Sequence, residues 1–222
     1  MFDTPESEAE LCWRAAALTG RTLGELAVVL GFPVPDDLRH AKGWAGGLVE
    51  TALGASAGNQ PVPDFVALGV ELKTIPCGPG GRPRESTFVC GLPADGGEAQ
   101  WEESRVHHKL GRVLWVPVDA VGPPALRRIG AARLWSPSAD QASILKGDWE
   151  ELTGLVRLGH LQQINARRGA ALQLRPKAAT GASTTWALDA DGEWRRSMPL
   201  AFYLRARFTA DILADGSGVA LF

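Results

Sequence analysis

Two acids and a lysine stand close together in the stretch Pro63–Pro76, at positions Asp64, Glu71 and Lys73. The residues of Gly69–Pro76 are mostly β-branched or apolar and are bounded by glycine and proline, a pattern that predicts a strand. Side chains alternate faces along a strand, so Glu71 and Lys73 are expected on the same face, roughly 7 Å apart along the chain. The pattern therefore predicts a carboxylate and an ammonium group side by side, with a second acid nearby.

This combination of groups is suited to metal-assisted chemistry on a phosphate. Neighbouring carboxylates repel one another unless a positive charge lies between them. Mg²⁺ can supply that charge, because it takes oxygen ligands and keeps several waters. A nearby lysine can then orient or deprotonate a metal-bound water, or stabilise charge that develops on a phosphate. The ordinary alternative is a half-buried strand with one surface ion pair, and the motif alone leaves both interpretations open.

The elements that must position these groups follow from periodicity and from turn residues. Helices are predicted over residues 6–18, 23–30, 42–54, 101–110, 138–158 and 210–214, and strands over 69–76, 86–90, 112–118, 128–135, 171–177 and 202–208. The strand over 86–90 is expected to return beside the acid-bearing strand as a hairpin, because a glycine-rich and proline-rich turn separates them.

Two of the predicted helices carry acids whose direction matters. The helix over 42–54 could bring Glu50 to Asp64 and Glu71, although a solvated helix glutamate fits the same pattern. In the helix over 138–158, Ile144 is expected to face the core and Asp148 the solvent.

Charge is distributed unevenly over the 222 residues. Residues 1–104 hold 7 Lys and Arg against 15 Asp and Glu, a net −8, and residues 105–222 hold 16 against 10, a net +6. This length fits a single domain, here with two expected lobes over about 1–105 and 106–222. An acidic lobe with a metal site beside a basic lobe that binds phosphate would produce the asymmetry, and so would chance variation of solvated faces.

Composition favours a protein of the cytoplasm. The chain lacks a run of eighteen apolar residues, so no membrane span is expected. Its acidic beginning is unlike a secretory signal. The cysteines, Cys12, Cys77 and Cys90, are odd in number and scattered, which suits a reducing compartment.

An acid followed by Glu-x-Lys on a strand resembles the signature of the PD-(D/E)xK nucleases. Segments in order along nearly the whole chain also resemble the MutH family of mismatch repair endonucleases and, more distantly, the Sau3AI restriction enzyme. The segments that carry this resemblance are Thr22–Leu26, Lys42–Trp44, Leu53–Gly58, Asp64–Pro76, Thr87–Cys90, His108–Leu110, Arg112–Trp115, Leu134–Pro137, Asp148–Leu152, Arg175–Ala179 and Phe202–Leu204.

The resemblance implies a fold and an active site. The fold would be α/β (α+β) and restriction-endonuclease-like, with a mixed central sheet flanked by helices and two lobes around a DNA-binding cleft. Asp64, Glu71 and Lys73 take the catalytic positions of the family. Glu50 takes that of a helix carboxylate that helps Asp64 and Glu71 to hold Mg²⁺ or Mn²⁺, and Lys109 that of a second active-site lysine.

The resemblance also implies a substrate and partners. Lys42, Arg175, Pro176 and Lys177 fall where the family contacts DNA, and Tyr203 where adenine methylation is sensed. The substrate would be a hemimethylated or unmethylated GATC site in double-stranded DNA, cut on the unmethylated strand. A MutL-type ATPase would activate a monomeric enzyme, with MutS acting indirectly.

Two other functions fit parts of the pattern. One is a Sau3AI-like restriction endonuclease that makes double-strand breaks. The other is a non-catalytic DNA-binding module that recruits repair proteins, although such a module does not require the acids and lysines of a cleavage site.

Overall fold

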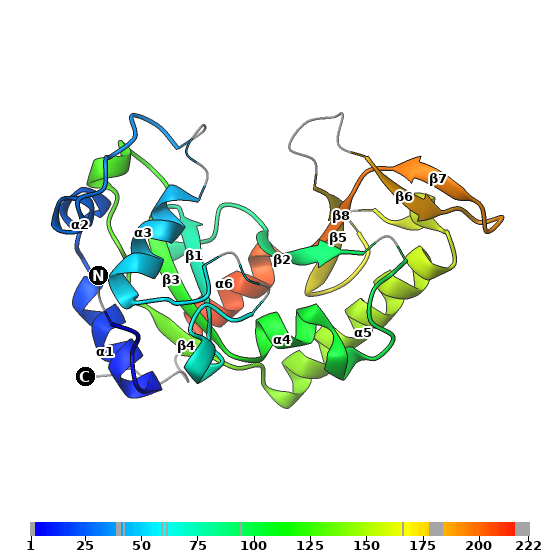
Figure 1. Ribbon diagram of the computed structural model, residues 1–222, viewed down its shortest axis with the longest axis horizontal. Helices are drawn as coiled ribbons and strands as arrows, with labels where there is room; N and C mark the ends of the chain where they lie inside the picture. The colour runs from blue at the N-terminus through cyan, green and yellow to red at the C-terminus, as the bar shows by residue number, and fades with distance from the viewer. Residues whose placement is uncertain are drawn as a thin grey trace. The chain divides into compact units, whose positions relative to one another are not determined.

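The computed structural model divides the chain into two compact units (Figure 1). It describes residues 3–38, 41, 43–58, 60, 62–93, 95–165, 167–177 and 184–215. The first unit comprises Met1–Glu85, Arg112–Ser136 and Ala210–Phe222, and the second Ser86–Gly111 and Pro137–Thr209. The chain therefore passes between the units more than once, whereas the sequence analysis expected a single division near residue 105.

A three-stranded mixed sheet forms the centre of the first unit. Strand β1 (Glu71–Cys77) runs parallel to β3 (Val113–Asp119), and β3 pairs antiparallel with β4 (Arg133–Trp135). The parallel register aligns Glu71 with Val113 and Lys73 with Trp115. The predicted acid-bearing strand is thus confirmed, and β3 next to it is almost fully buried, as its continuous apolar sequence indicates.

The predicted hairpin between residues 69–76 and 86–90 is wrong. Strand β2 (Thr87–Leu92) belongs to the second unit, where it pairs antiparallel with β8 (Leu200–Leu204). After β1 the chain makes only an isolated bridge between Cys77 and Pro83. Proline has no N–H to continue a ladder, so the local turn does not extend into strand pairing.

Three helices cover the sheet of the first unit. They are α1 (Glu8–Leu18), α2 (Leu23–Leu30) and α3 (Trp44–Leu53). Thr22 and Glu25 form a reciprocal capping box at the start of α2, as the sequence predicts. The apolar faces of the three helices pack against the sheet in one core, which includes Leu11, Leu23, Leu48, Leu53, Phe65, Val70, Leu114 and Ile129.

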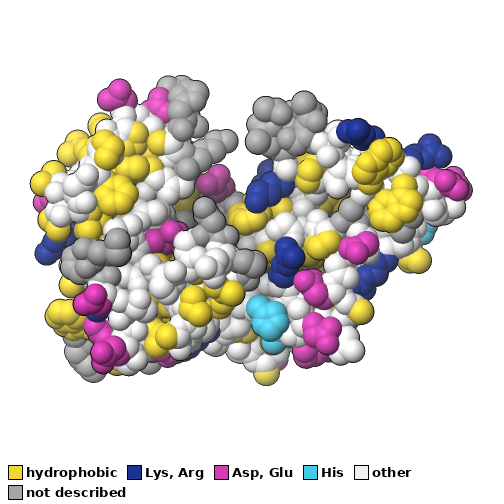
Figure 2. Space-filling view, viewed as in Figure 1, with side chains coloured by type: hydrophobic (Ala, Val, Ile, Leu, Met, Phe, Trp, Pro, Cys, Tyr) yellow, Lys and Arg dark blue, Asp and Glu magenta, His cyan; other side chains and the backbone are white. Residues whose placement is uncertain are grey.

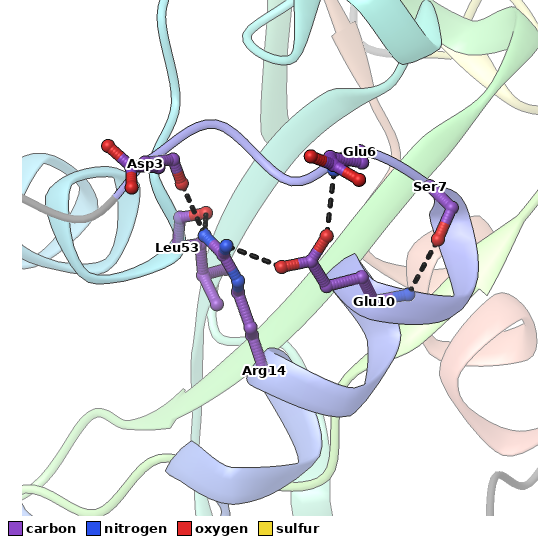
Figure 3. Close-up of polar contacts among 6 residues, drawn as sticks. All are labelled: Asp3, Glu6, Ser7, Glu10, Arg14 and Leu53. Atoms are coloured by element: carbon purple, nitrogen blue, oxygen red, sulfur yellow. Dashed lines mark hydrogen bonds and ion pairs between the residues drawn. The ribbon is translucent and has the colours of Figure 1, made fainter.

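Arg14 on α1 fastens the end of α3 (Figure 3). Its guanidinium donates hydrogen bonds to the carbonyl oxygens of Asp3 and of Leu53, the last residue of α3, and forms an ion pair with Glu10. Gly54 ends α3 in the left-handed conformation, where an added Cβ would lie 2.3 Å from the Asp3 carbonyl oxygen. The helix that carries Glu50 is therefore held at its C-terminal end.

The second unit contains an antiparallel sheet in the order β2-β8-β5, with β5 spanning Leu172–Pro176. A separate hairpin pairs β6 (Thr185–Leu188) with β7 (Trp194–Ser197). The helices of the second unit are α4 (Arg105–Gly111) and α5 (Ala139–Arg157). The residues of α6 (Ala206–Ala214) are divided between the two units. Short 3-10 turns occur at Val66–Leu68, Pro79–Gly81, Trp101–Glu103, Pro124–Leu126 and Leu161–Gln163.

Three local predictions in the second unit fail. The strand expected over 202–208 ends at Leu204, and α6 begins two residues later. Asp148 does not face solvent: it is 8% exposed, and its carboxylate accepts hydrogen bonds from the backbone N–H groups of Ala170, Ala171 and Leu172. Three donors stabilise the buried charge, and the bonds fix the beginning of β5 to α5. Ile144, expected in the core, is 43% exposed.

The class expected from the sequence, a mixed α/β (α+β) fold, is confirmed. Helices and sheets alternate along the chain, and parallel and antiparallel pairing meet in one sheet. Among the described residues, no helix combines the length and the apolarity that crossing a membrane would require. Within the part of the chain that the structure describes, Cys12, Cys77 and Cys90 form no disulfide.

Candidate active site

Glu71 and Lys73 form an ion pair on one face of β1, as the alternation of side chains predicts. Lys73 Nζ donates to Glu71 Oε1 at 2.6 Å, and the two side chains are only 15% and 4% exposed. The backbone of Glu71 is fixed to the residue that precedes β3, since its N–H donates to the carbonyl oxygen of Arg112 at 2.9 Å. Burial lowers the effective dielectric around these charges and strengthens their interaction.

Asp64 is tied to the same strand from a different segment. Its Oδ2 accepts a hydrogen bond of 2.7 Å from the N–H of Leu72, the residue between Glu71 and Lys73. Its carbonyl oxygen accepts a 3.0 Å bond from the N–H of Ser56, which follows α3. The loop after α3 and the strand β1 thus hold the Asp64 carboxylate beside the ion pair.

Glu50 brings a third carboxylate from α3. Partial burial, and then the negative charge of Asp64, raise the pKa of the Glu50 carboxyl above its usual value. Glu71 raises this pKa further, whereas the ammonium group of Lys73 lowers it. The four side chains therefore influence one another electrostatically, and the sequence-based hypothesis that α3 delivers a carboxylate to this place agrees with their arrangement.

A pocket of about 570 Å³ opens next to these groups within the first unit. Glu50 and Lys73 line it together with Thr74, Glu85, Asp119 and Arg127, among other residues. Asp119 was not among the site residues predicted from the sequence. Asp119 ends β3 opposite Cys77 in the parallel register, so the pairing of β1 with β3 was the missing information.

The donor set fits a hard divalent cation. Three carboxylates share one neighbourhood, and burial first, then the charge of Asp64, raises the pKa of the Glu50 carboxyl; a cation would stabilise its ionised form. Among the described residues, however, no three His, Cys, Asp or Glu side chains already form a closed cage. In this structure Lys73 donates a hydrogen bond to a carboxylate oxygen of Glu71, and the N–H of Leu72 donates one to a carboxylate oxygen of Asp64.

Three of the residues expected to contact DNA, Arg175, Lys177 and Tyr203, gather on one face of the second unit. The Arg175 guanidinium lies over the ring of Tyr203, with its carbon 5.4 Å from the ring centroid. Lys177 Nζ lies 3.7 Å from the centroid of Phe88, and the rings of Phe88 and Tyr203 meet edge to face at 5.6 Å. Three separate segments therefore supply two cations and two aromatic rings to one cluster.

The strand arrangement explains this gathering. Strand β8 lies between β2 and β5, and Tyr203 aligns with Phe88 on one side and with Gln173 on the other. Pro176 lies on the edge strand β5, where a residue without an N–H is tolerated. Phe88 was missed by the sequence analysis because β2 was assigned to the wrong neighbour.

Two expected site residues are not placed in either cluster. Lys109 lies in the last turn of α4, in the second unit, and its catalytic role stays a prediction. Lys42 lies outside the described residues. The arrangement as a whole offers one acidic cluster with a lysine for phosphate chemistry, and one cationic and aromatic cluster for contact with a nucleic acid.

Comparisons with known proteins agree with this chemistry. The model of the family described as "DNA mismatch repair enzyme MutH" matches residues 53–148, which include Asp64, Glu71, Lys73 and Lys109. The DNA mismatch repair protein MutH of Salmonella typhi is 53% identical, with 96% of this chain and 94% of the relative covered. The MutH protein of Klebsiella pneumoniae (strain 342) is 52% identical, with coverage of 95% and 92%.

The same protein of Escherichia coli (strain K12 / DH10B) is 48% identical, with coverage of 96% and 95%. Identity at this level over nearly the full length of both chains shows the family, as the resemblance of the separate segments predicted. The family consists of metal-dependent nucleases that act on DNA. The chain belongs to the MutH family of DNA mismatch repair endonucleases.

Proposed function

We propose that this endonuclease uses Mg²⁺, or Mn²⁺ in its place, to nick the unmethylated strand of hemimethylated or unmethylated GATC sites. The single observation that carries the proposal is the convergence of Glu50, Asp64, Glu71 and Lys73 from a helix, a loop and a strand. Membership of the family supports the substrate class, because the relatives are named as mismatch repair proteins.

The acidic cluster supplies the metal site of the proposal. Asp64, Glu71 and Glu50 would hold the cation with carboxylate oxygens, after side-chain rotations that release the contact between Lys73 and Glu71. A bound divalent cation lowers the pKa of its water and relieves charge on the phosphate. Lys73, held in a site of low exposure, then orients the attacking water through its ammonium group. Lys109 is assigned to the phosphate oxygens, where a second positive charge stabilises the charge that develops.

The cationic and aromatic cluster supplies the sequence preference. A guanidinium group such as that of Arg175 can bind guanine O6 and N7 in the major groove, and Pro176 stiffens the strand that presents it. Tyr203, whose ring lies beneath the guanidinium of Arg175, is assigned to adenine N6, where a methyl group would clash or remove a hydrogen bond. Lys42 and Lys177 are assigned to backbone phosphates.

Regulation and assembly complete the proposal. A MutL-type ATPase activates the enzyme and MutS acts through it, in the cytoplasm. One chain with one acidic cluster acts on one strand, so a monomer nicks. The rival restriction activity requires two clusters acting together on opposite strands.

A plasmid with one hemimethylated GATC site tests the function. With Mg²⁺ we expect nicked circles with the break in the unmethylated strand, more of them when a MutL-type ATPase and ATP are added, and none with chelator. A fully methylated plasmid should stay intact. Linear product that appears at the same rate as nicked circles would favour the restriction activity, and an intact hemimethylated plasmid under all conditions would reject cleavage at this site.

A further inference from the structure

The hairpin of β6 and β7 presents an aromatic face that the proposed function does not use. Trp186 and Trp194 are 54% and 53% exposed, although tryptophan is usually among the more buried residues. The guanidinium carbon of Arg196 lies 5.3 Å from the centroid of the Trp186 ring, and its Nη1 donates to Thr184 Oγ1 at 2.7 Å. In Figure 2, hydrophobic and basic side chains lie next to one another over this hairpin, at the upper right.

The register puts these three side chains on one side of the hairpin. Trp186 aligns with Arg196, and Leu188 aligns with Trp194. Side chains two residues apart share a face, so Trp186, Trp194 and Arg196 project together, while Ala187 projects from the opposite face. Ala187 is only 6% exposed. The hairpin therefore buries Ala187 on one face and displays the two indoles on the other.

We infer that this face is a stacking platform for unpaired DNA, separate from the site that cuts the duplex. Indole rings stack on any base, and an arginine beside them binds the phosphate between bases. Trp186 and Trp194 are diagonal neighbours on the hairpin, and such neighbours lie roughly 7–8 Å apart. Bases in a duplex are stacked about 3.4 Å apart along each strand, so this spacing suits the bases of an unstacked strand.

Charge and chain continuity favour DNA over a protein as the occupant. Residues 167–207, which contain Arg175, Lys177, Tyr203 and the hairpin, hold eight Lys and Arg against three Asp and Glu. Strand β5, with Arg175 at its exposed end, is the strand that precedes β6 in the sequence. Arg195 aligns with Ala187 on the opposite face and forms an ion pair with Asp189, so the guanidinium of Arg196 is the cation that the register places beside the indoles.

The inference goes beyond the proposed function, because a nuclease needs no such platform to cut. A strand released beside a nick is the DNA that would occupy it. The protein would then keep hold of the free strand after cleavage, for the class of reaction that unwinds or degrades a nicked strand.

Binding of a labelled oligothymidylate of about 12 nucleotides, a length within the usual range of single-strand sites, tests the platform. Anisotropy is measured in chelator, so that no cleavage occurs and no metal site contributes. We expect the variant with both Trp186→Ala and Trp194→Ala to bind at least tenfold more weakly than the unaltered protein. The variant with both Trp186→Phe and Trp194→Phe should recover most of the affinity, since it keeps aromatic rings.

Trp13→Ala is the matched control, because Trp13 is 70% exposed on α1 in the other unit. It should bind the oligonucleotide normally. Duplex and oligouridylate competitors distinguish an unpaired strand from a duplex, and DNA from RNA. Binding by the double alanine variant within twofold of normal, or displacement by duplex as effective as by single strand, would overturn the inference.

Nicking of the plasmid separates this inference from the proposed function. The double alanine variant should nick at the normal rate, because neither tryptophan belongs to the acidic cluster or to the cationic and aromatic cluster. If nicking falls in parallel with oligonucleotide binding, the hairpin belongs to the cleavage complex and no separate platform exists. If the unaltered protein binds the oligonucleotide but does not nick, the platform stands and the proposed function fails.

Discussion

The acidic cluster of the first unit and the cationic cluster of the second use charge in opposite ways. Glu71 and Lys73 are almost buried and ion-paired, whereas Arg175 and Lys177 are exposed and lie over aromatic rings. Groups that act on a bond gain from a site of low dielectric that holds them in place. Groups that read DNA must reach out of the surface, and ring contacts orient them without neutralising their charge. The comparison predicts different consequences of mutation in the two clusters.

The largest effect is expected from Asp64→Ala, which attacks the acidic cluster alone. Loss of a metal ligand removes several kcal/mol of transition-state stabilisation, so nicking should fall by about 10³-fold or more. DNA binding measured by gel shift should remain, because the cationic and aromatic cluster of the second unit is intact. Asp36→Ala, an exposed acid in the same unit, serves as the control. Normal cleavage by the Asp64 variant would remove this residue from the site.

Tyr203→Ser should instead change the choice of strand while leaving the chemistry intact. A good base contact is worth about 1–3 kcal/mol, so the preference for the unmethylated strand should fall by roughly 5-fold to 150-fold. Cleavage rates on the two methylation states of one oligonucleotide duplex measure this ratio. Tyr203→Phe keeps the ring contacts with Phe88 and Arg175, and so separates the hydroxyl from the packing. An unchanged ratio in the serine variant contradicts the assigned role.

Lys177→Ala should weaken DNA binding a few-fold and make it less dependent on salt. A lost phosphate contact reduces the slope of log affinity against log salt concentration by about 1. Titrations at several salt concentrations give the slope. Lys146→Ala is the matched control, since Lys146 lies on α5 in the same unit and is ion-paired with Glu102 at 3.2 Å. Identical slopes for both variants would exclude the phosphate contact.

The smallest effect is expected on stability, from Glu50→Gln in chelator. The pKa of Glu50 is raised by burial and by Asp64, so the ionised carboxylate destabilises the folded protein above that pKa. The glutamine variant should therefore melt a few degrees higher at neutral pH. The difference should shrink as the pH falls through the raised pKa, because the native glutamate then takes up its proton.

Glu6→Gln, at an exposed position of the same unit, should not shift the melting temperature in this way. A Glu50 variant that melts at or below the normal temperature across this pH range would show that repulsion within the acidic cluster is weak. The two clusters would then differ in the exposure of their charged groups, but not in the repulsion between like charges.

Local patterns were sufficient for the parts of the site that lie on one element. The alternation of side chains on β1 placed Glu71 beside Lys73, and the capping residues Thr22 and Glu25 placed the beginning of α2. They were insufficient for Asp148, because helical periodicity places its side chain on the polar face. Its three hydrogen-bond donors come from residues more than twenty positions later.

The strand with the acid and the lysine, the family and most helices could be predicted from the sequence, because they depend on neighbouring residues or on likeness along the chain. The pairing of β1 with β3 rather than β2, and the position of Phe88 beneath Lys177, became visible in the folded protein alone. Strand partners distant in sequence are selected by burial of whole faces and by pairing of backbone groups, and neither leaves a local pattern. The clusters are products of that long-range pairing.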